Sequence, residues 1–413
     1  MNRIVASAGV LVVGMAGVEA ANVTGLTPQQ MNKWWSVSAS LRGFYDDNVY
    51  QLPNKQSSPG LEFEPSFAVN FPLEQTLISA KYLFRLNYYA DRPSDNIDQA
   101  HELDFRLNHR FSERHTLNVA DSFVYSNEPE VVDRGAVVTT FNRTEATGVR
   151  NRAPIEFQAR LTRVLGFTAG YENVFYDYKQ DGSGSLSALL DRVEHVVHID
   201  AEYYFTENTL GFVGYQFGFY DYTSDDEVLA LSGVPGTERS RMANVLYLGG
   251  SHRFNQKLSG NVRVGAEHSD YEQAGADSDT SPYFDLNATY IYLPGSSIKA
   301  GVKVTHAATD VVGTDPGDLT QDQLAAAFYA NLTHRITSRI SGQWYGQFQY
   351  AEFNGGTFDG ENEGYLNTGL VLTYQININL SANAAYSFDW LTSDLPNREF
   401  TRNRVWAGLT VTY

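Results

Sequence analysis

Residues 61–71 read LEFEPSFAVNF and alternate between two kinds of side chain. The first set is apolar and consists of Leu61, Phe63, Pro65, Phe67, Val69 and Phe71. The second set is polar or small and consists of Glu62, Glu64, Ser66, Ala68 and Asn70. Because successive side chains of a β-strand point to opposite faces, the stretch predicts a strand with one apolar and one polar face. The same alternation occupies residues 35–45, 78–88 and 404–413.

Two-faced segments of this kind recur from residue 34 to residue 413, and helical periodicity is almost absent. Their number is about 18, within a range of roughly 16 to 20. The weakest are 209–222 and 241–254, where both faces carry apolar residues. The segment cores lie near 35–49, 60–71, 77–90, 99–111, 116–126, 152–162, 165–178, 192–205, 209–222, 241–254, 258–271, 282–293, 298–308, 323–336, 339–351, 364–376, 378–391 and 401–413.

The connections between segments alternate between short and long. Short ones include 71–76, 111–116, 205–209, 254–258, 293–297, 336–339 and 375–379, and long ones include 127–150, 179–191, 223–240, 309–322 and 353–363. This alternation indicates antiparallel hairpins with every tight turn on one side. We therefore expect an all-β fold, a transmembrane antiparallel up-and-down β-barrel with short periplasmic turns and long extracellular loops.

Soluble β-sandwiches and propellers also alternate, but their strands are shorter, typically about 5 to 6 residues. A tilted strand that crosses a bilayer needs about 9 to 11 residues. Aromatic residues make up 13% of the chain and gather near the segment ends, as at Trp34, Tyr50 and Trp390, which is typical of the two membrane interfaces. The absence of cysteine excludes disulfide scaffolds and Cys-ligated metals, and the net charge of −18 argues against nucleic-acid partners.

The N-terminus resembles a secretory signal peptide over residues 1–20, with Arg3 before an apolar run and small residues before a cleavage site after Ala20. The alternative is a retained anchor, for which the run is short. We expect residues 21–33 to form a short periplasmic segment and residues 34–413 to form the barrel. The aromatic Tyr413, which closes an alternating strand, resembles the signal that the barrel-assembly machinery reads.

The polar face of the segments would line the lumen of such a barrel. The pore-lining candidates are Arg42, Glu62, Glu64, Arg85, Asp104, Arg106, Arg160, Glu202, Arg263, Glu267, Lys303, Arg335 and Arg404. Centring the 71–76 turn places Glu62 opposite Arg85, and keeping face parity allows Arg85 to lie opposite Asp104. Such a row either sets a transverse field for permeating solutes or simply stiffens the wall. Loop 127–150 is the candidate for a segment folded into the lumen, the alternative being an ordinary surface loop.

Signatures of catalysis and metal binding are missing. The chain lacks HExxH, GxSxG and phosphate-loop motifs, and His195 and His198 point to opposite faces of one strand. Acidic residues crowd the long loops but match no defined calcium loop, so a solvated or lipopolysaccharide-facing surface is expected. We expect no enzyme activity, no cofactor and no resident metal.

Two features resemble a known family. The segment Gly43-Phe44-Tyr45-Asp46-Asp47-Asn48-Val49-Tyr50 resembles the opening of the "putative beta-barrel porin 2" family, and the turns at 110–117 and 253–258 are similar to that family's turns. The resemblance implies an outer-membrane barrel of a Gram-negative-type bacterium. Relatives often accompany exopolysaccharide export, and no catalytic residues come with the resemblance.

The sequence therefore predicts a porin-like channel for passive diffusion of small hydrophilic solutes, either sugars or cations. The alternatives are a barrel component of exopolysaccharide export and a non-conducting structural or adhesive surface barrel. Tyrosines at lumen positions favour the carbohydrate versions: Tyr176, Tyr178, Tyr204 and Tyr345. The expected partners are outer-membrane lipid, lipopolysaccharide, the barrel-assembly machinery and either solutes or polysaccharide. Whether the protein forms a homo-oligomer is left open by the sequence.

Overall fold

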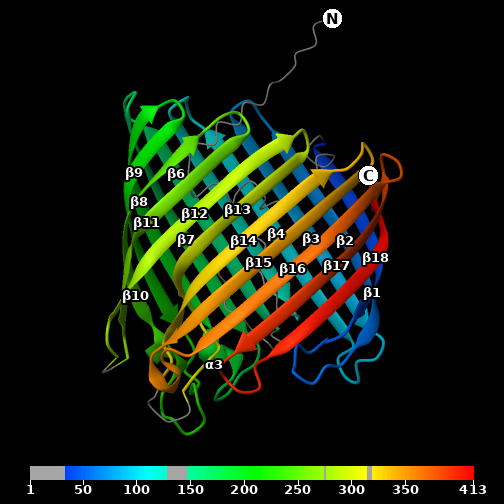
Figure 1. The fold of residues 1–413 in the computed structure, drawn as a ribbon, viewed down its shortest axis with the longest axis vertical. Coiled ribbons are helices and arrows are strands. Elements are labelled where there is room, and N and C mark those ends of the chain that lie inside the picture. The colour runs from blue at the N-terminus through cyan, green and yellow to red at the C-terminus, as the bar shows by residue number, and fades with distance from the viewer. Residues whose placement is uncertain (1–32, 128–146, 274–275, 314–318) are drawn as a thin grey trace, which may run out of the picture.

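The computed structural model describes residues 33–127, 147–273, 276–313 and 319–413, and β-strands dominate it (Figure 1). The strands are β1 (Trp35–Asp46), β2 (Ser58–Pro72), β3 (Thr76–Tyr89), β4 (Ile97–Arg110), β5 (His115–Ser126), β6 (Gly148–Arg160), β7 (Leu165–Tyr178), β8 (Arg192–Thr206), β9 (Thr209–Tyr222), β10 (Arg241–Arg253), β11 (Leu258–Tyr271), β12 (Asp279–Leu293), β13 (Ser296–Ala307), β14 (Asp322–Arg335), β15 (Ile340–Asn354), β16 (Asn362–Gln375), β17 (Leu380–Ser393) and β18 (Phe400–Thr412). The helix α3 (Leu186–Leu190) and the 3₁₀ turns η1 (Gly236–Arg239) and η2 (Gly356–Phe358) lie in loops. No helix in the described residues is both long and apolar enough to cross a membrane.

The 18 strands form one sheet that closes on itself. Each strand pairs antiparallel with the next, and β1 pairs with β18 from Ser38 opposite Thr412 to Asp46 opposite Arg404. The predicted number of about 18 strands and the up-and-down order are confirmed. The start of β1 and the end of β18 both lie at the short-turn end, and α3 lies at the long-loop end (Figure 1).

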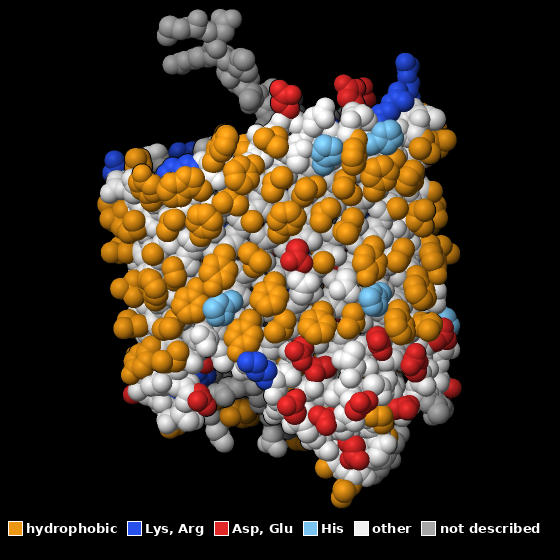
Figure 2. Space-filling view, turned by 180° about the vertical axis from the view of Figure 1, so that it is seen from behind, with side chains coloured by type: hydrophobic (Ala, Val, Ile, Leu, Met, Phe, Trp, Pro, Cys, Tyr) orange, Lys and Arg blue, Asp and Glu red, His pale blue; other side chains and the backbone are white. Residues whose placement is uncertain are grey.

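The outer face of the barrel is apolar and exposed, the reverse of a water-soluble protein. Leu246 and Leu248 keep 64% and 65% of their surface exposed, whereas Glu267 on the inner face keeps 2%. Hydrophobic side chains form a wide band around the face drawn in Figure 2, and acidic side chains gather at its loop end. A surface of this kind is stable only in contact with lipid, because in water it would be a large, continuous, exposed apolar patch.

Strands β9 and β10 depart from simple alternation for a structural reason. Their inward apolar residues pack together in a buried cluster on the inner wall, which consists of Leu210, Phe212, Val245, Tyr247 and Tyr283. The outward face of the two strands is therefore apolar because it contacts lipid, and the inward face is apolar because it forms this cluster. This packing explains the weak sequence pattern at 209–222 and 241–254.

The short turns share one construction. In the turn at Phe254, the backbone N–H of Phe254 donates to the Leu258 oxygen (3.0 Å), and Asn255 Oδ1 accepts from the backbone N–H of Leu258 (3.0 Å). Thr337 and Asn377 cap the turns before β15 and β17 in the same way. A short polar side chain just after an apolar strand end thus satisfies turn amides that have no strand partner.

Glycines on the inner wall leave room for aromatic rings of the neighbouring strand. Gly214 lies opposite Tyr247, and a Cβ atom there would come within 2.1 Å of Asp200 Oδ1 and 2.3 Å of the Tyr247 ring. Replacing Gly214 by valine should destabilise the barrel by about 1–3 kcal/mol through overpacking. Gel electrophoresis of unheated samples measures this loss of stability as a smaller fraction of protein that migrates as the folded, heat-modifiable species.

Gly43 provides the matched control for Gly214. It lies in β1, and nothing lies within 4 Å of a Cβ added there. Gly43→Val should therefore fold as well as the parent chain. Equal folded fractions for the two variants would contradict the role assigned to Gly214.

Candidate solute pathway on the inner wall and at the mouth

A row of alternating charges crosses five neighbouring strands of the inner wall; we call it the charge row. It consists of Arg404 on β18, Arg42 on β1, Glu62 and Glu64 on β2, Arg85 on β3 and Glu102 on β4. Arg42 pairs with Glu62 and, at 3.1 Å, with Glu64, and Arg85 pairs with Glu64 and Glu102, each at 3.1 Å. Arg404 Nη2 lies 3.7 Å from Glu62 Oε2. Both signs thus face the lumen within one continuous chain of ion pairs.

The register of this row differs from the sequence prediction by two residues on β2. Glu62 lies opposite Asn87 rather than Arg85, and Asp104 lies opposite Lys81 rather than Arg85. The turn is not centred on 71–76, because Pro72 pairs with Leu77 and the Leu73 N–H donates to the Thr76 oxygen (2.8 Å). The shift is two residues for Glu62 and four for Asp104. Because both shifts are even, every side chain stays on its face, and an acid–base–acid row still forms with Glu64, Arg85 and Glu102 as its members.

Aromatic rings hold the arginines of the charge row flat against the wall. The Arg42 guanidinium lies 4.8 Å from the Trp406 ring, and the Arg404 guanidinium lies 4.6 Å from the Phe44 ring. Phe44 lies opposite Gly60, which leaves space for its ring. Cation–π contacts and ion pairs together fix both guanidinium groups in place.

Other candidates lie on the inner wall outside the row. Asp104 accepts a hydrogen bond from Ser122 Oγ (3.0 Å), and Arg106 lies opposite Ser79. Lys303 lies opposite Asp285 on β12. Arg335 is different, because it ends β14 at the short-turn rim and is exposed.

The wall formed by β6 to β12 is more densely packed. Tyr247 donates to Asp200 (2.6 Å), and the Arg263 guanidinium lies 5.3 Å from the Tyr247 ring. Near the short-turn end, Glu202 accepts hydrogen bonds from Thr168 (2.6 Å) and Tyr204 (2.7 Å), and the Arg160 guanidinium lies 4.4 Å from the Tyr204 ring. The candidates Arg160, Glu202 and Arg263 therefore lie within packed clusters rather than in the charge row.

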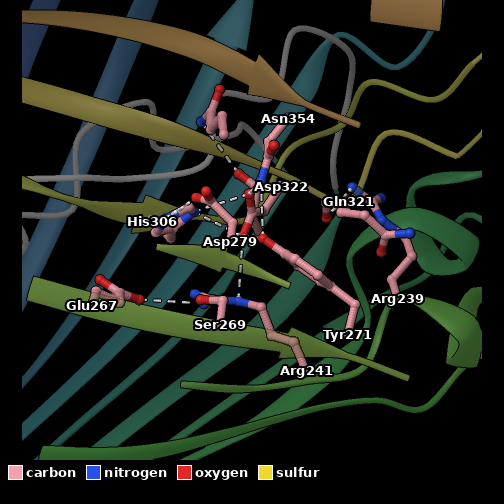
Figure 3. Close-up of polar contacts among 12 residues, drawn as sticks. Arg239, Arg241, Glu267, Ser269, Tyr271, Asp279, His306, Gln321, Asp322 and Asn354 are labelled. Atoms are coloured by element: carbon pink, nitrogen blue, oxygen red, sulfur yellow. Dashed lines mark hydrogen bonds and ion pairs between the residues drawn. The ribbon is translucent and has the colours of Figure 1, made fainter. Parts of the chain in front are cut away.

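A second polar network closes the wall at the loop end of β10 to β15 (Figure 3). Arg241 donates to Glu267 (3.3 Å) and Ser269 (2.7 Å), and its Nε lies 3.5 Å from Asp322. Asp322 also accepts from Tyr271 (2.9 Å) and contacts His306 Nδ1 (3.0 Å). Arg241 and Asp322 are almost fully buried. The candidate Glu267 belongs to this network.

His306 occupies a break in the sheet. The β12–β13 pairing runs only from Phe284 opposite Val304 to the turn, so the loop end of β12 pairs with β11 alone. His306 Nε2 contacts Ser281 (2.7 Å) and Asp279 (3.2 Å) beyond this point. Polar side chains thus replace backbone pairing and keep the wall closed there.

Arg239 ties together three long loops at the mouth. This fully buried side chain donates to the backbone oxygens of Leu189 (2.8 Å), Thr309 (2.9 Å) and Gln321 (3.4 Å). An apolar cluster packs beside it, formed by Leu186, Leu189, Leu190, Val228 and Leu319. We call residues 179–191, 223–240, 308–313 and 319–321 the loop cluster. Burial lowers the pKa of the Arg239 guanidinium, whose hydrogen bonds are all to neutral carbonyls.

Arg398 extends this connection along the rim to the β17–β18 loop. It binds Asp310 (2.8 Å) in the loop cluster and Glu363 (2.8 Å) at the start of β16. Although burial acts to lower it, the two carboxylates raise the pKa of Arg398, so the guanidinium stays charged. Arg239 and Arg398 thus join the β7–β8, β9–β10, β13–β14 and β17–β18 loops.

Sequence reasoning missed Arg239, Arg241, His306, Asp322 and Arg398. Their only signal is that Arg239 and Arg398 are basic residues within strongly acidic loops. Carbonyl acceptors such as Leu189 O cannot be read from a sequence, because every residue has one. The predicted inward-folding loop 127–150 lies almost entirely outside the described residues.

The loop cluster contains a titratable group that should make it sensitive to pH. Burial raises the pKa of Asp191 to about 6, although it accepts hydrogen bonds from Ser187 Oγ (2.5 Å) and the Tyr178 N–H (2.7 Å). Between pH 4 and 6 the folded loop then binds more protons than the unfolded loop, so its stability falls as pH rises through that window. Amide exchange in α3, corrected for intrinsic rates, should increase about tenfold or more from pH 4 to 7.

Asp191→Asn is the control for this pH dependence. The amide cannot ionise, so corrected exchange in α3 should become independent of pH over the same range. A pH dependence that persists in the variant would assign the effect to another group.

Among the described residues, no group of three or more His, Asp or Glu side chains could hold a metal ion. His195 contacts Tyr171 on the outer face (2.8 Å), while His198 lies 3.9 Å from Glu156 inside. The two histidines point to opposite faces, as the sequence predicts.

Several solved outer-membrane channels are similar to this chain. A BenF-like porin from Pseudomonas fluorescens Pf-5 has a TM-score of 0.46 at 11% identity, with 92% of this chain and 99% of that chain covered. OpdK from Pseudomonas aeruginosa with vanillate has a TM-score of 0.45 at 10% identity (92% and 99% covered). OccAB4 from Acinetobacter baumannii has a TM-score of 0.44 at 10% identity (94% and 100% covered). No curated protein matches the sequence.

The family comparison covers nearly the whole barrel. The model of the family described as "Putative beta-barrel porin 2" matches residues 36–413, from the second residue of β1 to Tyr413. The resemblance noted at residues 43–50 is therefore confirmed. With its closed barrel, apolar outer face and charged inner wall, the chain belongs to this porin family and is a porin-like outer-membrane β-barrel.

Proposed function

We propose that the protein is a passive channel for small hydrophilic solutes and has no enzyme activity. The observation that supports this most strongly is the charge row, which presents both signs to the lumen of an 18-stranded barrel. Side chains fill barrels of about 8 strands, whereas barrels of about 16 to 18 strands leave an aqueous channel. A wall of fixed charges stabilises water and polar solutes better than apolar ones.

We place the pathway along β1 to β6. The opposite wall carries the buried aromatic cluster around Tyr247, and Arg239 and Arg398 join four of the long loops between β7 and β18. Asp104, Arg106 and Arg152, in contrast, are only partly buried on the inner wall. Solutes would pass the charge row, whose transverse field orients dipolar molecules.

The net charge of −18 favours cations over anions at the mouth. This preference should weaken at high salt because salt screens exposed charges. We therefore propose sugars and small cations as the solutes.

Liposome swelling tests the channel proposal directly. Vesicles that contain the protein should swell in isotonic sugars, with rates that fall from pentose to disaccharide to longer oligosaccharides. Protein-free vesicles and vesicles with heat-unfolded protein are the controls. Equal swelling in all three preparations would contradict passive diffusion and favour a structural or adhesive barrel.

A second candidate is passage of a polysaccharide chain, which the inner aromatic rings favour. Tyr329 and Tyr345 lie opposite Gly301 and Gly369 on the inner wall, where their rings occupy the space that the glycines leave. Tyr204 also lies on this wall and contacts Arg160. Long oligosaccharides should block the ion current through the channel, and Tyr329→Ala and Tyr345→Ala should each abolish this block. A block that is unchanged in both variants would count against this candidate.

We further propose that residues 1–20 are a cleaved export signal, that 21–33 form a short periplasmic segment and that the barrel-assembly machinery reads Tyr413. The exposure of Tyr413 supports the last point: the residue is 67% exposed, and its ring centroid lies 5.7 Å from that of Trp35. Lipopolysaccharide would meet the acidic loop end through divalent ions. N-terminal sequencing of the mature protein checks cleavage, and a start other than residue 21 would revise the boundary.

A further inference from the structure

One charged side chain lies on the lipid-facing wall far from any strand end. In the described strands, the outward positions that are not buried and hold Asp, Glu, Lys or Arg are Asp121, Asp177, Asp221, Asp270 and Glu352. The last four lie within two residues of the loop end of their strands. Asp121 lies in the middle of β5, between the outward residues Val119 and Phe123. Figure 2 shows an acidic side chain within the hydrophobic band of this face.

The bonding of Asp121 is incomplete among the described residues of one copy. Asn151 on β6 donates from Nδ2 to Asp121 Oδ1 (2.9 Å). Within the described residues, Asp121 Oδ2 has no hydrogen-bond partner, and the second amide hydrogen of Asn151 is also unused. Acyl chains can satisfy neither group, and an ionisable side chain on the lipid face is costly unless it finds a partner.

We propose that a second copy of this chain packs against the wall formed by β5 and β6. A two-fold axis parallel to the barrel axis would pass between the two Asp121–Asn151 pairs. Each Asn151 would then donate its second amide hydrogen to Asp121 Oδ2 of the other copy. The patch is self-complementary because it holds one open acceptor and one open donor side by side, as a two-fold interface requires.

The surroundings of the pair suit close contact between two walls. Ala153, on the same face of β6 as Asn151, is small and lets backbones approach. The neighbouring outward residues are apolar and exposed, with Ile155 at 45%, Tyr171 at 38% and Phe175 at 36%. A lipopolysaccharide headgroup is a poorer partner, because its polar groups would have to reach Asp121 in the middle of the wall.

The absence of cysteine from the chain allows a clean cross-linking test. Ala153→Cys places one thiol beside the proposed axis, and Ala330→Cys places a matched thiol on the outward face of β14, across the barrel. A short bismaleimide applied to outer membranes should yield about fivefold or more covalent dimer with Ala153→Cys than with Ala330→Cys. Equal yields at the two positions would overturn the proposal.

A second substitution in the same chain distinguishes cross-linking that depends on the proposed hydrogen bonds from cross-linking that results from crowding in the membrane. In the Ala153→Cys background, Asp121→Leu and Asn151→Leu should each remove most of the dimer, because each removes one partner of the proposed hydrogen bond. Heat-modifiable migration verifies that each barrel is folded. Phe123→Cys replaces Ala153→Cys if the latter folds poorly, and a dimer that survives Asp121→Leu would also overturn the proposal.

Discussion

Replacing Arg239 by alanine will loosen the mouth of the barrel while the barrel itself stays folded. The change leaves three loop carbonyls without their donor and opens a cavity beside the apolar cluster of the loop cluster. Each buried acceptor left unpaired costs about 1–3 kcal/mol. Amide exchange in α3 and in residues 308–313 should rise at least about tenfold, and single-channel conductance should increase because the rim widens.

Arg239→Lys is the informative comparison for this prediction. Lysine keeps the charge but reaches the three carbonyls, which belong to two loops, less well, because it lacks the planar fork of arginine. Exchange in α3 should then lie between that of the parent and that of Arg239→Ala. Exchange and conductance that do not change in Arg239→Ala would show that other contacts hold the loops together.

Neutralising the arginines of the charge row will change the ion selectivity of the channel. Arg42→Gln together with Arg85→Gln leaves Glu62, Glu64 and Glu102 without these two positive neighbours. Two unit charges removed from the wall should raise the cation-to-anion permeability ratio roughly three- to tenfold at 0.1 M salt. Reversal potentials in a salt gradient measure this ratio.

Two control pairs bracket the selectivity prediction. Glu62→Gln with Glu64→Gln should shift the ratio toward anions, since the neighbouring arginines remain. Arg163→Gln with Arg339→Gln removes the same charge from exposed short turns and should change the ratio much less. An equal effect of the turn pair and the row pair would place the selectivity-determining step outside the charge row.

Much of the fold can be read from alternation because lipid imposes it on every strand. A residue such as Leu61 or Phe63 must face acyl chains, while Glu62 and Glu64 cannot, so the segments and their faces are visible in the sequence. Register is harder to read. A slip of two residues leaves every face unchanged, so Glu62 opposite Arg85 is as consistent with the pattern as the observed pairing of Glu64 with Arg85.

The loop cluster could not be predicted for a different reason. Arg239 is held by carbonyl oxygens of Leu189, Thr309 and Gln321, and these acceptors carry no sequence signal. The inner aromatic cluster was visible only as a weakness of the pattern at β9 and β10. Asp121, in contrast, interrupts the apolar face of 117–125 in the sequence itself, which reads Leu117, Val119, Asp121, Phe123 and Tyr125.

The central claim is that the 18-stranded barrel conducts, and planar-bilayer recording of the purified protein tests it most directly. The protein should first show heat-modifiable migration, so that a folded barrel is what is measured. We predict stepwise, long-lived current increments that are weakly cation-selective at low salt and lose this selectivity at high salt. A folded, membrane-inserted barrel that passes no ion current would contradict the account.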